Sequence, residues 1–174
     1  MKLKKLCEVY DQDTNINLSG RSYRIAKLEL PADLPRKISG NFYCFDNQLT
    51  SLEHCPIEIG GNFDCSSNQL TTLEFCPSVI GGFFNCYLNR LTTLKDIHRH
   101  VKKIGGRFSG HDNRIKSHIL GLMLIEIGGK IGTGLGDGKD VDEILNKWKN
   151  QGRKGVLGCQ RELIDMGYEE LAQL

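Results

Sequence analysis

The sequence lacks a long hydrophobic run: no stretch approaches the roughly 18 apolar residues that would identify a membrane-spanning helix. It also lacks a strong net charge, because 23 basic and 21 acidic side chains leave +2 at pH 7, so no strong field directs it to nucleic acid or to an anionic membrane. The basic start MKLKKLCEVYDQD is not followed by the apolar segment of a secretory signal. We therefore expect a soluble, cytoplasmic protein.

The seven cysteines do not fit a disulfide framework. Their number is odd, and a chain that is not exported stays in a reducing compartment. Five of them recur at a fixed spacing along the chain, which is typical of core positions. We interpret them as reduced side chains that act as small hydrophobes.

One phrase recurs about every 21 residues. The units span 38–58, 59–79, 80–103 and 104–126, and a partial unit starts at Ile127. The aligned columns are Phe42, Phe63, Phe84 and Phe108; Cys44, Cys65, Cys86 and Gly110; Asn47, Asn68, Asn89 and Asn113; Leu49, Leu70, Leu91 and Ile115; and Leu52, Leu73 and Leu94.

Each column has a physical role in a stack of short strands. Phe-x-Cys alternates with a period of two, so both side chains point to one face of a strand, and neighbouring strands bury that face together. The Asn follows the strand, where its amide can pair backbone groups that the turn leaves free. The Gly-Gly pairs before each strand suit a tight bend or a close backbone approach. The repeat therefore predicts a parallel-β solenoid with an internal asparagine ladder.

The stretch LELPADLPRKISGNFYCFDNQLTSL resembles the short repeats of bacterial leucine-rich-repeat proteins. The pattern CxxNxLTxLxxCP…IGGxFxC is similar to uncharacterised leucine-rich-repeat proteins of tailed bacteriophages, which also tend to end in a tail like CQRELIDMGYEELAQL. The resemblance covers roughly residues 28–131 and 139–174. It implies a leucine-rich-repeat solenoid of the α+β class.

The ends of a solenoid need caps, because the terminal coils would otherwise expose apolar rungs. We expect an N-terminal β cap over 1–37, the solenoid over 38–131, a glycine-rich hinge over 132–139 and a helical cap or tail over 140–174. The segment DVDEILNKWKNQG predicts a helix that ends near Gly152, with an apolar face formed by Val141, Ile144, Leu145 and Trp148. The tail either covers the last coil or docks a partner.

In this fold, strand residues beside the buried pair face outward on a concave surface. The residues that vary there are the candidate partner-binding residues: Tyr43, Phe45, Asp64, Phe83, Asn85, Tyr87, Arg107 and His111. Their aromatic side chains favour an apolar patch of the kind that marks interaction sites. The alternative is that these aromatics only pack across strands or beneath another segment.

The sequence gives weaker signals for metal, phosphate or catalytic sites. The cysteine columns run in a line and lack the C-x2–4-C knuckle of zinc sites, and the glycine run GTGLGDGKD does not match phosphate-loop spacing. His98, His100, His111 and His118 could ligate a metal, but His-x-His in the basic segment DIHRHVKK favours a solvated stretch; this segment could also contact an acidic partner or RNA. Cys159 could be a nucleophile, but its helical context favours a buried thiol. We therefore expect no enzymatic activity, no cofactor and no metal.

The expected function is non-enzymatic protein binding through the concave face. The phage resemblance implies an accessory protein that binds and neutralises a host factor, such as a defence protein, in the bacterial cytoplasm. We do not expect nucleic acid or a membrane as a partner. The alternative function is assembly, in which the chain forms a homo-oligomer through the sheet edge or the helical tail.

Overall fold

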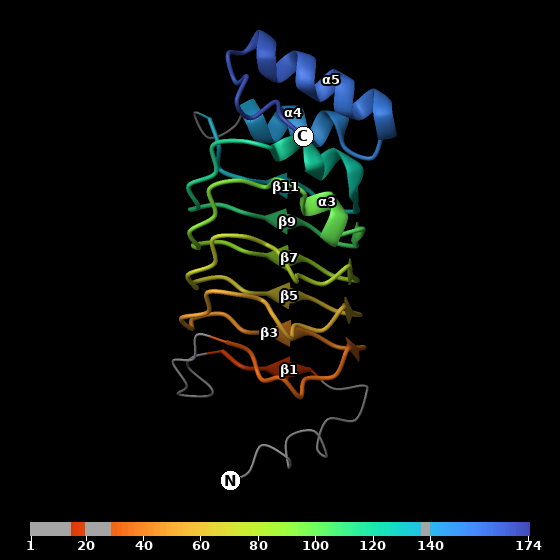
Figure 1. Cartoon of the computed structure of the whole chain (residues 1–174). Coiled ribbons are helices and arrows are strands. Elements are labelled where there is room, and N and C mark those ends of the chain that lie inside the picture. Colours follow the sequence, from red (N-terminus) through yellow and green to blue (C-terminus); the bar gives the residue numbers. More distant parts are fainter. Residues whose placement is uncertain (1–14, 20–28, 137–139) are drawn as a thin grey trace.

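The computed structural model describes residues 15–19, 29–136 and 140–174, and in them the chain winds as a β-solenoid (Figure 1). Each coil contributes one two-residue strand to each of two parallel sheets. Sheet A has the order β1 (Ile16–Asn17), β3 (Phe42–Tyr43), β5 (Phe63–Asp64), β7 (Phe84–Asn85), β9 (Phe108–Ser109) and β11 (Ile131–Gly132). Sheet B has the order β10 (Glu126–Ile127), β8 (Lys103–Ile104), β6 (Val79–Ile80), β4 (Glu58–Ile59) and β2 (Lys37–Ile38).

We number the coils from sheet B: coil 1 starts at Lys37, coil 2 at Glu58, coil 3 at Val79, coil 4 at Lys103 and coil 5 at Glu126. The parallel-β solenoid predicted from the repeat is confirmed. Sheet B was not predicted, because each of its strands carries a single buried residue, such as Ile59 or Ile80, and a single position shows no alternation. Figure 1 shows the coils stacked in a straight column, so we call the outer surface of sheet A the sheet A face rather than a concave face.

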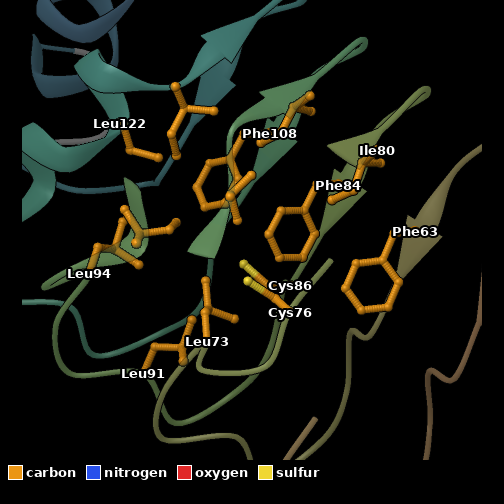
Figure 2. Close-up of a cluster of buried hydrophobic side chains, with 14 of the residues drawn as sticks. Phe63, Leu73, Cys76, Ile80, Phe84, Cys86, Leu91, Leu94, Phe108 and Leu122 are labelled. Atoms are coloured by element: carbon orange, nitrogen blue, oxygen red, sulfur yellow. The ribbon is translucent and has the colours of Figure 1, made fainter. Parts of the chain in front are cut away.

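The predicted Phe-x-Cys column forms the core. Phe42, Phe63, Phe84 and Phe108 are each at most 1% exposed, and successive rings lie 5.9, 5.1 and 5.5 Å apart between centroids. Figure 2 shows three of these rings in a row beside the thiols of Cys76 and Cys86. Because the column continues through four coils, each ring is buried by the coils above and below it.

The glycine pairs lie at the corner between sheets B and A, where successive coils come closest. A Cβ atom on Gly81 would lie 2.0 Å from the carbonyl oxygen of Gly60, and one on Gly105 would lie 2.0 Å from that of Gly81. Close backbone approach, rather than a positive φ, therefore explains these glycines.

The asparagine ladder is present as predicted. The Nδ2 of Asn68 donates to the carbonyl oxygens of Cys44, Cys65 and Ser66, and its Oδ1 accepts from the Leu49 main-chain N–H. Asn89 and Asn113 repeat the arrangement one coil further along. Each amide therefore joins its own turn to the preceding coil.

Short helices interrupt the later coils and close the C-terminal end. Coil 3 contains α3 (Ile97–His100), and coil 4 contains the 3-10 helix η1 (Ile119–Leu124); the sequence segment around α3 was expected to be irregular. Two longer helices follow, α4 (Asp140–Trp148) and α5 (Gly152–Asp165), and Gly152 begins α5 instead of ending α4. Among the described residues, every helix is too short or too polar to cross a bilayer.

Side chains of α4 occupy the open edge of coil 5. Asn146 donates to and accepts from the Ile131 backbone, and Asn150, which follows the helix, does the same with Ile127. Asp142 accepts from the Thr133 N–H at 2.8 Å. The tail therefore lies on the last coil. Of the expected N-terminal cap, residues 1–14 and 20–28 lie outside the described residues, and β1 pairs with β3.

Candidate functional site

Over coils 1–4, the sheet A face displays three outward columns, each with one residue from each of these coils. The strands β3, β5, β7 and β9 place their second residues outward, and the positions two before and two after them also point away from the core. The columns are Asn41, Asn62, Phe83 and Arg107; Tyr43, Asp64, Asn85 and Ser109; and Phe45, Ser66, Tyr87 and His111. All eight sequence-predicted residues are therefore on this face.

Asp64 and Asn85 lie side by side, and their polar atoms form hydrogen bonds to each other and to the neighbouring backbone. Asn85 Nδ2 donates to Asp64 Oδ2 at 3.1 Å. The other oxygen of Asp64 accepts from the Ser66 N–H at 2.9 Å, and Asn85 Oδ1 accepts from the Tyr87 N–H at 3.2 Å. These two side chains shape the turns that follow their strands, and they hold the centre of the face rigid.

The predicted aromatic residues form two groups. Tyr43 and Phe45 of coil 1 lie edge to face with 6.3 Å between ring centroids, and both are half-buried. Phe83 of coil 3 is half-buried beneath the Arg107 guanidinium, which lies 5.7 Å from the ring centroid. Polar residues of coil 2 separate the two groups, and the contact of Arg107 with the Phe83 ring joins neighbouring coils.

Coil 3 exposes a pair of neighbouring apolar side chains at the edge of this face. Tyr87 is 37% exposed and Leu88 is 47% exposed. Leu88 has a φ of 52°, the left-handed region that a branched apolar side chain rarely adopts. Its column otherwise holds Asp46, Ser67 and Asp112, which are small or polar residues suited to a turn.

Leu88 was not among the eight partner-binding candidates, although the sequence predicts that it faces outward with Phe83, Asn85 and Tyr87. A leucine in a column of aspartate and serine breaks the pattern of the repeat at one coil only. The fold gains less from it than from a core leucine, because Leu88 is 47% exposed. An exposed apolar side chain at a turn position that takes a positive φ in each of coils 1–4 makes Leu88 a candidate binding residue.

His111 bounds the site on the coil 5 side. Its imidazole lies against the backbone of Gly132 and Gly134, where added Cβ atoms would come 2.5 Å and 2.7 Å from ring nitrogens. The His111 carbonyl accepts a hydrogen bond from the Leu88 N–H at 3.1 Å. The glycine-rich stretch after β11 therefore makes room for the ring, which stands beside the Tyr87–Leu88 pair.

A pocket of about 280 Å³ lies between α4 and α5. Glu162 accepts from Lys147 at 2.8 Å and from the Trp148 indole N–H at 2.7 Å. These hydrogen bonds lower the pKa of the Glu162 carboxyl, so it stays ionised and joins the two helices. The arrangement supports a structural ion pair rather than a general acid.

Burial shifts the pKa of several cysteine thiols and of one histidine. The six described cysteines are buried and free, and burial raises the pKa of Cys76 and of Cys159 to about 12, which leaves these thiols protonated and poorly nucleophilic. Burial also lowers the pKa of His98, whose Nδ1 is buried without a hydrogen-bond partner. No group of three or more His, Cys, Asp or Glu in 15–19, 29–136 and 140–174 could hold a metal ion.

The fold and the site define the chain as a parallel β-solenoid with a mixed apolar and polar face. Comparisons with protein-family models, with curated proteins and with solved structures found no match. The resemblance to leucine-rich-repeat proteins of tailed phages therefore stays a prediction.

Proposed function

We propose that this protein is a non-enzymatic binding module that recognises another protein through the sheet A face. The observation that carries the proposal is the Tyr87–Leu88 pair: two apolar side chains exposed side by side, one of them in a left-handed conformation. Tyrosine and large apolar residues surrounded by polar groups are typical of the centre of protein interfaces.

The surroundings of the pair fit this role. Asp64 and Asn85 are locked by hydrogen bonds to each other and to the following turns, so the surface is organised before a partner arrives. Binding to a rigid surface loses less conformational entropy than binding to a flexible one. Arg107 and His111 supply polar groups at the rim, while Tyr43 and Phe45 extend the face toward coil 1.

The resemblance to phage sequences suggests the kind of partner to test. On that resemblance, the partner is a host factor, such as a defence protein, in the cytoplasm of an infected bacterium, and binding neutralises it. Assembly is the competing function. Self-association through the C-terminal sheet edge would have to displace Asn146 and Asn150, which already pair with the backbone of coil 5.

The test compares the wild-type protein with a Tyr87→Ser, Leu88→Asn double variant. Each is immobilised and exposed to a lysate of a phage-host bacterium, retained proteins are identified by mass spectrometry, and the affinity of each retained protein is measured after purification. Loss of two central apolar contacts should weaken binding at least about tenfold. Asparagine tolerates the left-handed conformation, so the variant should unfold at the same or a higher denaturant concentration.

The matched control is Ile57→Ser, which removes an apolar side chain that is 36% exposed beside sheet B. It should leave the affinity unchanged. A partner that binds the double variant as tightly as the wild type would place the interface elsewhere. Recovery of only further copies of this chain, from both proteins, would favour assembly instead.

A further inference from the structure

Four cations lie on coils 3 and 4, in the segments that follow the turn after each sheet A strand. We define the basic cluster as Arg90, Lys95, Arg114 and Lys116, all of which are exposed. Among the described residues, none of the four side chains forms an ion pair or a hydrogen bond. The cluster therefore holds four cations without an ion pair to any described residue, in a chain whose net charge is only +2.

The two arginines stand one above the other. Thr93 pairs with Ser117 in parallel register, and the Lys116 N–H donates to the Thr92 carbonyl at 2.9 Å, so residues 24 apart in sequence share a column here. Arg90 and Arg114 have the same separation, and adjacent coils lie about 4.8 Å apart. Like charges placed directly opposite each other in adjacent strands destabilise the sheet.

The fold does not require these cations. The same columns hold Gln48 and Gln69, and then Thr50 and Thr71, in coils 1 and 2. On sheet B, by contrast, the outward charges of adjacent coils are paired: Lys37 with Glu58 at 2.7 Å, and Lys103 with Glu126 at 2.8 Å. One side of the solenoid neutralises its own charge, while the basic cluster leaves its charge open to a partner.

From this arrangement we infer that the partner presents an extended acidic segment to the basic cluster. Arg114 and Lys116 are two residues apart in an extended stretch, so their side chains leave the surface about 6.6 Å apart, which is also the spacing of alternate carboxylates on an extended peptide. The column of Lys95 holds Glu53 and Glu74 in coils 1 and 2, where an acidic segment would meet like charge.

The inference rests on the proposed function and specifies its partner. The basic cluster adjoins the Tyr87–Leu88 pair, because Leu88 lies in the turn after β7 and Arg90 follows it by two residues. The partner therefore combines an apolar contact at this turn with acidic residues beyond it. A second copy of this chain would place cation against cation if the two clusters met, so charge complementarity favours a different, acidic protein.

The test uses a fluorescein-labelled peptide in which glutamate alternates with threonine, with binding measured by fluorescence anisotropy. The wild type should bind at low salt, and the affinity should fall as NaCl is raised, because exposed charges are screened within about 10 Å at 0.1 M salt. An Arg114→Gln, Lys116→Thr variant, which installs the residue types of coils 1 and 2, should bind about fivefold more weakly. Its unfolding midpoint should stay the same or rise, because like-charge repulsion is relieved.

The matched control is Lys37→Gln, Lys103→Gln, which removes the same amount of charge from sheet B and should leave peptide affinity unchanged. Equal loss in both variants, or no binding by the wild type, would overturn the inference. Tighter binding of a single-stranded RNA that carries the same number of charges would overturn it as well and assign the cluster to nucleic acid.

The same peptide separates failure of the inference from failure of the proposed function. It lacks an apolar residue, so the Tyr87→Ser, Leu88→Asn variant should still bind it while losing the protein partner. If the peptide fails while capture of a partner still depends on Tyr87 and Leu88, only the acidic chemistry is wrong. If the peptide binds and no partner depends on Tyr87 and Leu88, the proposal that a partner binds the sheet A face is wrong.

Discussion

Replacing Asn68 with alanine tests how the stack is held together. Asn68 is 8% exposed, and its Nδ2 donates to the carbonyls of Cys44, Cys65 and Ser66 at 2.9, 3.0 and 3.1 Å. Its Oδ1 accepts from the Leu49 N–H at 3.0 Å. Alanine removes all four hydrogen bonds at once, and the carbonyls of Cys44 and Cys65 keep only the donors that Asn47 and Asn89 supply.

The expected cost follows from the groups left behind. A buried donor or acceptor without a partner costs about 1–3 kcal/mol, and the carbonyls deprived of one donor add to the cost of the orphaned Leu49 N–H. We therefore expect the free energy of unfolding to fall by about 2–3 kcal/mol. Urea denaturation followed by circular dichroism measures the change, and an unaltered dependence on urea concentration would show that the same surface is exposed.

Asn47→Ala is the matched control. Asn47 also donates to three carbonyls, those of Leu18, Cys44 and Phe45, but it is only half-buried. Its loss should cost less than that of Asn68, because water can reach the freed groups. If both variants unfold at the same urea concentration as the wild type, the ladder does not stabilise the stack, and the apolar columns hold it alone.

Two further perturbations test the glycine corner between sheets B and A and the contact between helices α4 and α5. Gly81→Ala should prevent stable stacking of coils 2 and 3, because the new Cβ would lie 2.0 Å from the Gly60 carbonyl oxygen; a variant with wild-type melting behaviour would contradict this contact. The depressed pKa of Glu162 means that its bonds to Lys147 and Trp148 stabilise the fold above its unfolded pKa and are lost as the pH falls through its folded pKa. Fluorescence of Trp148, the single tryptophan, should report this acid transition, and Glu162→Gln should remove it; a transition of equal size in that variant would assign it to another carboxyl.

The repeat could be predicted because the structural positions of each coil hold the same residue types at the same spacing. Phe63 and Cys65 alternate, so they point to one side of a strand, and Asn68 recurs at the turn where backbone groups need partners. These are local requirements that depend on residue type and spacing, and stacking copies of one unit multiplies them. The same logic predicted that the cysteines are buried and free, as the six described cysteines are.

Sequence alone therefore determined the solenoid, its core columns and the asparagine ladder. The tertiary structure decided which variable residues reach solvent, since outward direction does not guarantee exposure: Phe83 lies beneath Arg107, whereas Leu88 is open. It also decided where the tail lies, because hydrogen bonds from Asn146 and Asn150 to coil 5 join segments whose contact no spacing encodes. Repeats encode what each coil needs from itself and its neighbours, while the exposed surface depends on how side chains from different coils cover one another.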